Sequence, residues 1–169
     1  MTEAQIEHFY IMIQNIIESD EFVKMSFVQH HIKTSMYDHC LKVAYLCYKH
    51  HHRFHCHMEL YELVRAALLH DYFLYDRINK DSGSNINRFI HAFKHANIAL
   101  NNAIEDYPDL TSAEQNAIKR HMFPLTVVPP TTKCGWLICY YDKIAAVGDY
   151  FHVQKWKKEL EQYCPQILR

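Results

Sequence analysis

Six histidine and aspartate residues of this chain stand out as candidates for metal binding or proton transfer, and five stretches of the sequence carry them. Imidazole nitrogens and carboxylate oxygens are common metal ligands, and imidazole also exchanges protons near neutral pH. Apart from one adjacent pair, each residue lies on, or at the edge of, a different predicted helix. The set indicates a metal site if the fold brings its members together: His39, His70, Asp71, His95, His121 and Asp142.

The adjacent pair, His70-Asp71, closes the apolar run LVRAALLHDYFLYD. A helix through this run places at least one of the two polar side chains near the core, where burial without partners is costly. Asp142 in WLICYYDKIAAV meets the same constraint, because a buried carboxylate needs a cation, a metal ion or several hydrogen-bond donors. The competing interpretation is structural, since a single core histidine or buried aspartate is usually satisfied by ordinary hydrogen bonds.

The elements that must position these residues are predicted to be helices. Apolar residues recur at helical spacing in most of the chain, and Thr111 with Glu114 forms a capping-box pattern that opens one helix. Segments 76–87 and 126–133 are predicted loops because of their turn residues and paired prolines. We expect an all-α, single-domain bundle of six to eight helices over residues 3–20, 35 into the 40s, 60–75, 95–106, 112–121, 136–151 and around Lys157.

Composition narrows the function classes. The chain has 169 residues and only 3 glycines, which argues against a glycine-lined phosphate loop. Its 18 basic and 19 acidic residues nearly cancel, so bulk nucleic-acid binding is not expected. There is no basic leader segment and no apolar run of membrane-spanning length. The six cysteines lack a metal-binding spacing and are expected to be reduced thiols, which predicts a cytoplasmic protein with no membrane partner.

The order His, His-Asp, His, His, Asp on successive helices resembles the HD superfamily of metal-dependent phosphohydrolases. It is most similar to members with a two-metal site, of which the HD-GYP phosphodiesterases are the best-known branch. HDYFLYD with RHMFPLTVVPP downstream also resembles a group of small stand-alone bacterial HD proteins. The resemblance implies one HD domain over residues 1–169, of the HD/PDEase type, with its core at about 28–150. The segments that carry it are SMYDHCLKVAYLCY, RAALLHDYFLYD, FKHANIALNNA, IKRHMFPLT and CYYDKIAAV.

The same resemblance implies a dinuclear site with Asp71 as the bridge between its two ions and with Asp71 and His70 at the catalytic centre. Two ions about 3.5 to 4 Å apart would share a bridging water, whose hydroxide attacks phosphorus in line. The mixed nitrogen and oxygen ligands suit Fe or Mn best, with Zn, Co, Ni or Mg as other candidates. The implied ligands of the first ion are His39, His70, Asp71 and Asp142, and those of the second are Asp71, His95 and His121.

This chain departs from its relatives at two positions. His95 is followed by Ala96, where relatives often have proline, but proline there does not bind metal. The lysine that follows the His-Asp pair in the HD-GYP branch has no counterpart in residues 72–77. The second departure argues against a cyclic dinucleotide as the substrate.

Further residues are weaker candidates. His30, Lys94 and Arg120 lie next to ligand segments and are predicted to bind substrate. The competing interpretation of Lys94 and Arg120 is a solvated surface, because helix neighbours of a ligand point about 100° away from it. His91, four residues before His95, is a reserve ligand. The run from His50 to His57 is expected to be an exposed polar connection that binds metal adventitiously rather than by design.

The expected function is hydrolysis of a phosphate ester or anhydride in a small phosphorylated metabolite, with a nucleotide as the favoured substrate. The alternatives are hydrolysis of dinucleoside polyphosphates or cyclic dinucleotides, and a non-catalytic metal or nucleotide sensor on the same fold. A metal-free structural cluster is a third possibility. Trp136 and the aromatic C-terminal stretch fit either a core or an interface, which leaves a homodimer open.

Overall fold

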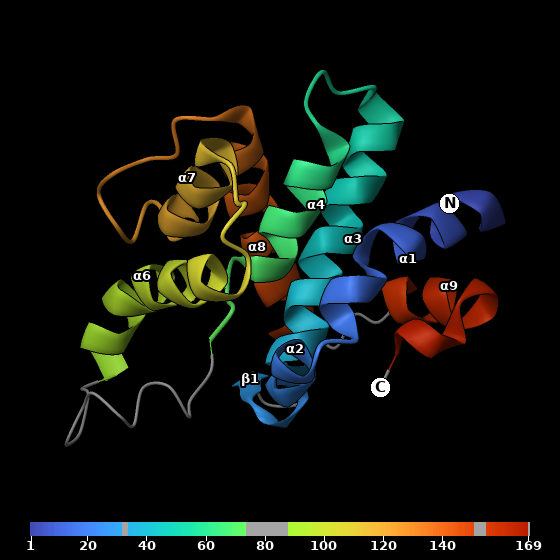
Figure 1. Cartoon of the computed structure of the whole chain (residues 1–169), viewed down its shortest axis with the longest axis horizontal. Helices are drawn as coiled ribbons and strands as arrows, with labels where there is room; N and C mark the ends of the chain where they lie inside the picture. Colours follow the sequence, from blue (N-terminus) through green and yellow to red (C-terminus); the bar gives the residue numbers. More distant parts are fainter. Residues whose placement is uncertain (32–33, 74–87, 151–154, 169) are drawn as a thin grey trace.

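The computed structural model describes residues 1–31, 34–73, 88–150 and 155–168, with the side chains of all of these except 29–31, 88–93 and 150. The described part is an all-α bundle, as the sequence predicts (Figure 1). A short antiparallel pair, β1 (Gln29–His31) and β2 (Thr34–Ser35), precedes the first central helix. The helices are α1 (Glu3–Ile17), α2 (Asp20–Lys24), α3 (Met36–Phe54), α4 (Leu60–Leu69), α6 (Arg88–Asp106), α7 (Ser112–Arg120), α8 (Lys133–Tyr150) and α9 (Lys155–Tyr163), with 3-10 turns η1 (Met25–Phe27) and η2 (Pro165–Ile167).

Helices α3, α4 and α8 form the centre of the bundle (Figure 1). α3 packs against both α4 and α8, while α7 packs against α4 and α8 and is covered in turn by α6. On the opposite side α1 lies beside α9, which brings the two ends of the described chain near each other. His39 and Asp142 therefore lie on central helices, and the pair His70-Asp71 directly follows a third, α4.

Local sequence signals explain several helix ends. The predicted capping box is confirmed: the Thr111 hydroxyl accepts a hydrogen bond from the Glu114 amide at 3.3 Å, and the Glu114 carboxylate accepts one from the Thr111 amide at 2.7 Å. Ser35 begins α3 in a similar way, because its hydroxyl accepts a hydrogen bond from the Asp38 amide. Such caps satisfy amides that have no partner within the helix.

Two predicted boundaries are wrong. α6 begins at Arg88, well before the predicted start at His95. α4 ends at Leu69 instead of continuing to residue 75, because the Tyr72 amide turns back to the Leu69 carbonyl at 3.2 Å. The side chain of Asn102 in α6 then donates to the Tyr72 carbonyl at 3.0 Å and holds this turn. The predicted loop at 76–87 lies outside the described residues.

The prediction of a polar connection from His50 to His57 is also wrong for the first half of this run, which is helical. α3 continues to Phe54 and ends at His55, which adopts a left-handed conformation with φ 47°. His50 on α3 hydrogen-bonds through Nδ1 to the Tyr141 hydroxyl of α8 at 2.8 Å, and His51 bonds to the Met58 carbonyl at 3.0 Å. The last turns of α3 carry histidines instead of apolar residues. The prediction from apolar spacing therefore ended the helix too early.

The structure also bears on two expectations drawn from composition, which concern membrane-spanning segments and the cysteines. None of the helices in the described part is both long and apolar enough to cross a membrane. All six cysteines are free, as predicted.

Glu159 of α9 offers a test of the contact between α9 and α3. Burial raises the pKa of its carboxyl, but hydrogen bonds from the Met1 amino group, Tyr45 and Lys49 outweigh burial and lower the pKa to about 2. A carboxyl with a lowered pKa stabilises the fold above its unfolded pKa of 4.5, and this contribution is lost as pH falls towards 2.

We therefore expect Glu159→Gln to lower the free energy of unfolding by about 2 kcal/mol at pH 7, a figure reduced from the full shift because the carboxyl is partly solvated. The difference from the unmodified chain should at least halve at pH 3. Urea denaturation at the two pH values measures both effects, with Glu161→Gln at an exposed position of α9 as the control. An unchanged difference at pH 3 would contradict the prediction.

Candidate metal centre

The six residues predicted to bind metal converge in the structure, although five helices and their ends supply them. Their ligand atoms form two groups, and within each group all atoms lie within 4.8 Å of one another. The first group joins α3, the end of α4 and α8. The second group joins Asp71, the residue that follows His70, with α6 and the end of α7. The groups are His39, His70 and Asp142, and Asp71, His95 and His121.

The first group centres on the Asp142 carboxylate. Its Oδ1 lies 3.1 Å from Nε2 of His39 and 3.7 Å from Nε2 of His70. Both histidines are completely buried, while the Asp142 side chain is 13% exposed. This group is therefore closed on the side of α3 and α4 and reachable from the side of α8.

The second group centres on the Asp71 carboxylate. Its Oδ1 lies 3.3 Å from Nε2 of His121 and 3.4 Å from Nε2 of His95, and the two imidazole nitrogens are 3.2 Å apart. Its other oxygen, Oδ2, lies 3.6 Å from Nε2 of His70. Asp71 therefore presents one oxygen to each group.

Helix ends fix the orientation of two of these histidines. His70 and His121 occupy the positions that directly follow α4 and α7, and each approaches through Nδ1 the carbonyl three residues earlier, Ala67 at 2.8 Å and Ile118 at 2.7 Å. A carbonyl only accepts, so Nδ1 of both rings carries the proton. In neutral rings Nε2 then holds the lone pair and faces the cluster, which is the arrangement of a metal-ligating histidine.

The cluster has buried polar atoms without hydrogen-bond partners. Nε2 of His70 and Oδ1 of Asp71 are both buried and unpaired among the described residues. Acceptor atoms that face one another in a dry site repel unless a cation lies between them. A metal ion meets this need with the ligand types present, so the residues fit a metal site.

The pKa shifts of His70 and Asp71 agree with this need for positive charge. Burial lowers the pKa of His70, but the Asp71 carboxylate, together with Asp142 and Cys40, outweighs burial and raises that pKa well above its usual value. Burial raises the pKa of Asp71, whereas His70, His121 and His95 lower it well below the usual range. Protons and metal ions therefore compete for the same atoms, and metal binding should release protons.

A second layer of groups holds His39. Its Nδ1 lies 3.1 Å from Oδ2 of Asp149, and the other oxygen of Asp149 accepts a hydrogen bond from the Lys42 ammonium at 2.7 Å. Lys42 and Asp149 are buried, and Lys42 also donates to the Ala145 carbonyl at 3.0 Å. A carboxylate on the far nitrogen of a ligating histidine fixes the ring and makes it a stronger ligand.

An open cavity of about 600 Å³ lies over the cluster. Asp71, His95 and Asp142 form its polar floor, and Lys143 lies beside them. The Lys143 ammonium donates to the His121 carbonyl at 2.9 Å and to Oδ2 of Asp142 at 3.4 Å. The cavity gives a small molecule a route to both groups of ligands.

The structure does not bring all of the weaker candidates to this cavity. Lys94 is exposed and Arg120 half-buried, and neither is among its described lining residues. The backbone of His30 lies in β1 and that of His91 in α6, but both side chains lie outside the described ones. No residue of the His50–His57 run belongs to either described metal-ligand group.

Sequence reasoning missed Asp149 and Lys143. Asp149 follows Asp142 by two helical turns, so the two share a face of α8, and this spacing was a usable signal. Lys143 is adjacent to Asp142, and no spacing rule would have selected it, because neighbours on a helix point about 100° apart.

Comparisons of the chain with protein-family models, curated proteins and solved structures found no match.

Proposed function

We propose that this chain is a metal-dependent phosphohydrolase of the HD type that cleaves an ester or anhydride bond of a small phosphorylated metabolite, such as a nucleotide. The observation that carries the proposal is the position of Asp71, whose two oxygens face two separate histidine-containing groups at the base of an open cavity. A cluster needed only for packing has no reason to lie under a cavity or to leave buried acceptors unpaired.

Each residue has a role in this proposal. His39, His70 and Asp142 would hold one divalent ion and His95 and His121 a second, with Asp71 as a ligand shared between the two groups. Bound divalent ions would supply Lewis acidity and a water of lowered pKa. Fe or Mn suits the mixed nitrogen and oxygen ligands best, and Asp149 holds His39 in its ligating orientation.

The reaction is a simple hydrolysis. A new bond forms between the water oxygen and phosphorus, and the bond from phosphorus to the leaving oxygen breaks. The leaving oxygen takes up a proton, so the products are an alcohol, or a shorter phosphate, and a free phosphate group. The Lys143 ammonium is placed to balance negative charge on the phosphoryl oxygens.

The first test joins metal content to turnover. The chain is purified without added metal, reloaded with Mn²⁺ or Fe²⁺, and assayed on bis-p-nitrophenyl phosphate, p-nitrophenyl phosphate and a panel of mononucleotides, dinucleoside polyphosphates and cyclic dinucleotides. We expect two ions per chain and turnover that depends on them. Nucleotide binding without turnover under any divalent ion would instead identify a sensor. A metal-free chain with an unchanged melting temperature on metal addition would identify a structural cluster.

Asp149→Asn tests the layer behind the ligands. The amide keeps the shape of the side chain but removes the negative charge that attracts His39 and Lys42. Because His39 is then held less firmly as a ligand, we expect metal affinity to fall about 10- to 100-fold. Competition with a chelator of known affinity measures the change. Asp20→Asn, at an exposed position, is the matched control. Unchanged affinity in the Asp149 variant would show that its contact with His39 serves packing alone.

A further inference from the structure

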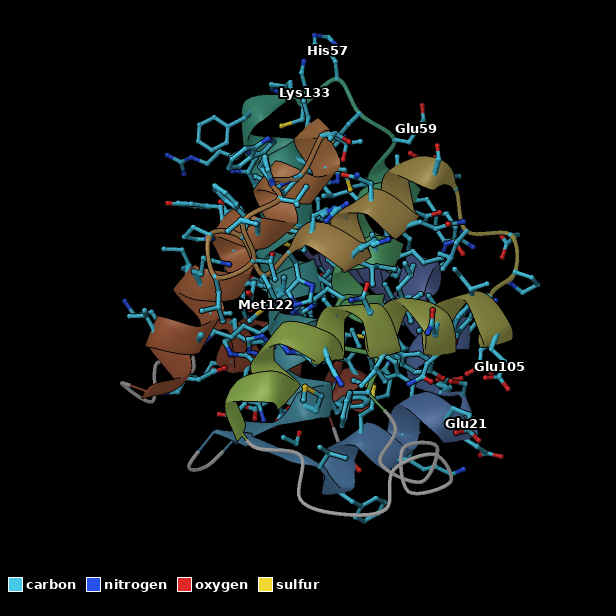
Figure 2. The ribbon with its side chains drawn as sticks, turned by 90° about the vertical axis from the view of Figure 1, so that its left-hand side faces the viewer. Glu21, His57, Glu59, Glu105, Met122 and Lys133 are labelled. Atoms are coloured by element: carbon cyan, nitrogen blue, oxygen red, sulfur yellow. The ribbon has the colours of Figure 1, made fainter. Side chains whose placement is uncertain are left out.

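Besides its polar floor, the cavity is lined by apolar side chains, which we call the apolar wall. After α7 the chain turns through Met122, Pro124 and Leu125, which line the cavity together with Ala146 of α8. Figure 2 shows Met122 in the region where the ribbons of α6, α7 and α8 meet. Pro124 and Leu125 are exposed, and 46% of the Leu125 surface is open to solvent. Exposed apolar side chains at the rim of a polar site indicate contact with a ligand.

This wall is anchored to α8 by three contacts. The Phe123 ring packs against that of Trp136 with 5.3 Å between centroids, and the Cys139 thiol donates to the Phe123 carbonyl at 3.0 Å. Lys143 holds the His121 carbonyl at 2.9 Å. The cavity is thus formed before a ligand arrives, which lowers the entropy cost of binding.

Lys143 lies at the boundary between the apolar wall and the polar floor. An ammonium has three donors. Two are directed at the His121 carbonyl and the Asp142 carboxylate, which leaves one that can be donated to a ligand. Its side chain is 43% exposed, so a ligand can reach it from the cavity. An anionic group over the floor therefore meets a fixed positive charge on one side.

We propose that the substrate is a phosphate ester with a flat, apolar body, whose phosphoryl group lies against Lys143 and whose body packs on Met122, Pro124 and Leu125. This inference rests on the proposed function and specifies its substrate class. An aromatic ring, including a nucleobase, fits the wall, whereas a polyol would leave its hydroxyl groups without partners there. The cavity volume of about 600 Å³ accommodates a ligand of this size.

Phosphonates test the inference without hydrolysis, because their carbon–phosphorus bond is not cleaved. Binding of phenylphosphonate and methylphosphonate to the Mn²⁺-loaded full chain is measured by calorimetry. Burial of a phenyl ring on the wall should make phenylphosphonate bind about tenfold more tightly. Leu125→Ser should remove most of this advantage and leave the affinity for methylphosphonate unchanged.

Variants at Lys143 test the other end of the ligand. Lys143→Met should weaken the binding of both phosphonates by the same factor, about tenfold, with metal content unchanged. The control, Lys119→Met at an exposed position of α7, should leave the binding of both unchanged. Equal affinity of the unmodified chain for the two phosphonates would overturn the inference, and so would unchanged binding by Lys143→Met.

The same assays separate this inference from the proposed function. Preference for phenylphosphonate without turnover of phenyl phosphate would support the substrate class and contradict catalysis. Turnover of phenyl phosphate with kcat/KM no higher than that of glycerol phosphate would support catalysis and contradict the substrate class.

Discussion

Asp71→Asn will abolish metal binding at both groups and lower turnover by about 10³-fold or more, equivalent to about 4 kcal/mol of transition-state stabilisation. The physical reason is the shared position of this carboxylate, which lies 3.3 Å from His121, 3.4 Å from His95 and 3.6 Å from His70. An amide has nearly the same shape but no charge, and its NH₂ group faces nitrogens that need a cation. One substitution therefore acts on both groups.

Metal analysis of the purified variant, together with the phosphodiester and phosphomonoester assays, measures this result. Asp142→Asn is an informative partner, because Asp142 belongs only to the group with His39 and His70. We expect that variant to keep metal on the side of His95 and His121 and to bind about one ion per chain. Asp20→Asn again serves as the surface control.

The Asp71 variant also has an expected effect on the metal-free protein. In the metal-free form the Asp71 carboxylate and His70 shift each other's pKa towards the charged states, so removal of the Asp71 charge should lower the melting temperature of that form at neutral pH. Full metal content with full turnover in Asp71→Asn would contradict the assignment of Asp71 as the shared ligand. Inactivity that results from unfolding would be recognised by loss of the cooperative thermal transition of the metal-free form.

Arg65→Met will destabilise the fold by about 3 to 5 kcal/mol. Arg65 in α4 is buried and forms a paired contact with the Glu114 carboxylate of α7, with Nε to Oε1 at 2.6 Å and NH2 to Oε2 at 2.9 Å. Methionine fills similar space but leaves the fully buried Glu114 without its cation. Because His70 and His121 directly follow these helices, the pair also fixes the positions of these two candidate ligands relative to each other.

Thermal unfolding measures the effect, which should appear as a fall of about 10 °C in melting temperature for a domain of this size. The matched control is Asp109→Asn, because Asp109 contacts the same guanidinium at 2.7 Å but its side chain is 71% exposed. It should have little effect. The double variant Arg65→Met with Glu114→Gln should recover part of the loss, since no unpaired charge then remains buried. A single variant as stable as the unmodified chain would show that the buried pair contributes nothing.

Secondary structure could be predicted from the sequence where it depends on residues close together in the chain. The spacing of Ile6, Phe9 and Ile13 predicted α1, and all three are buried in the core. The capping box at Thr111 and Glu114 was predicted because it is formed by residues three positions apart. The end of α4 was not predicted, because the turn that follows it is held by a hydrogen bond from Asn102, which is remote in sequence.

For the site, the sequence by itself determined which side chains are available and on which helices they lie. The six candidate ligands were identified from residue type, from their order and from the cost of placing polar groups in apolar runs. Only the tertiary structure decided that Asp71 has one oxygen toward each group, that Asp149 and Lys42 support His39, and that Lys143 borders an apolar wall. Helical spacing reports on which face of a helix a residue lies, whereas these contacts depend on how helices distant in sequence pack together.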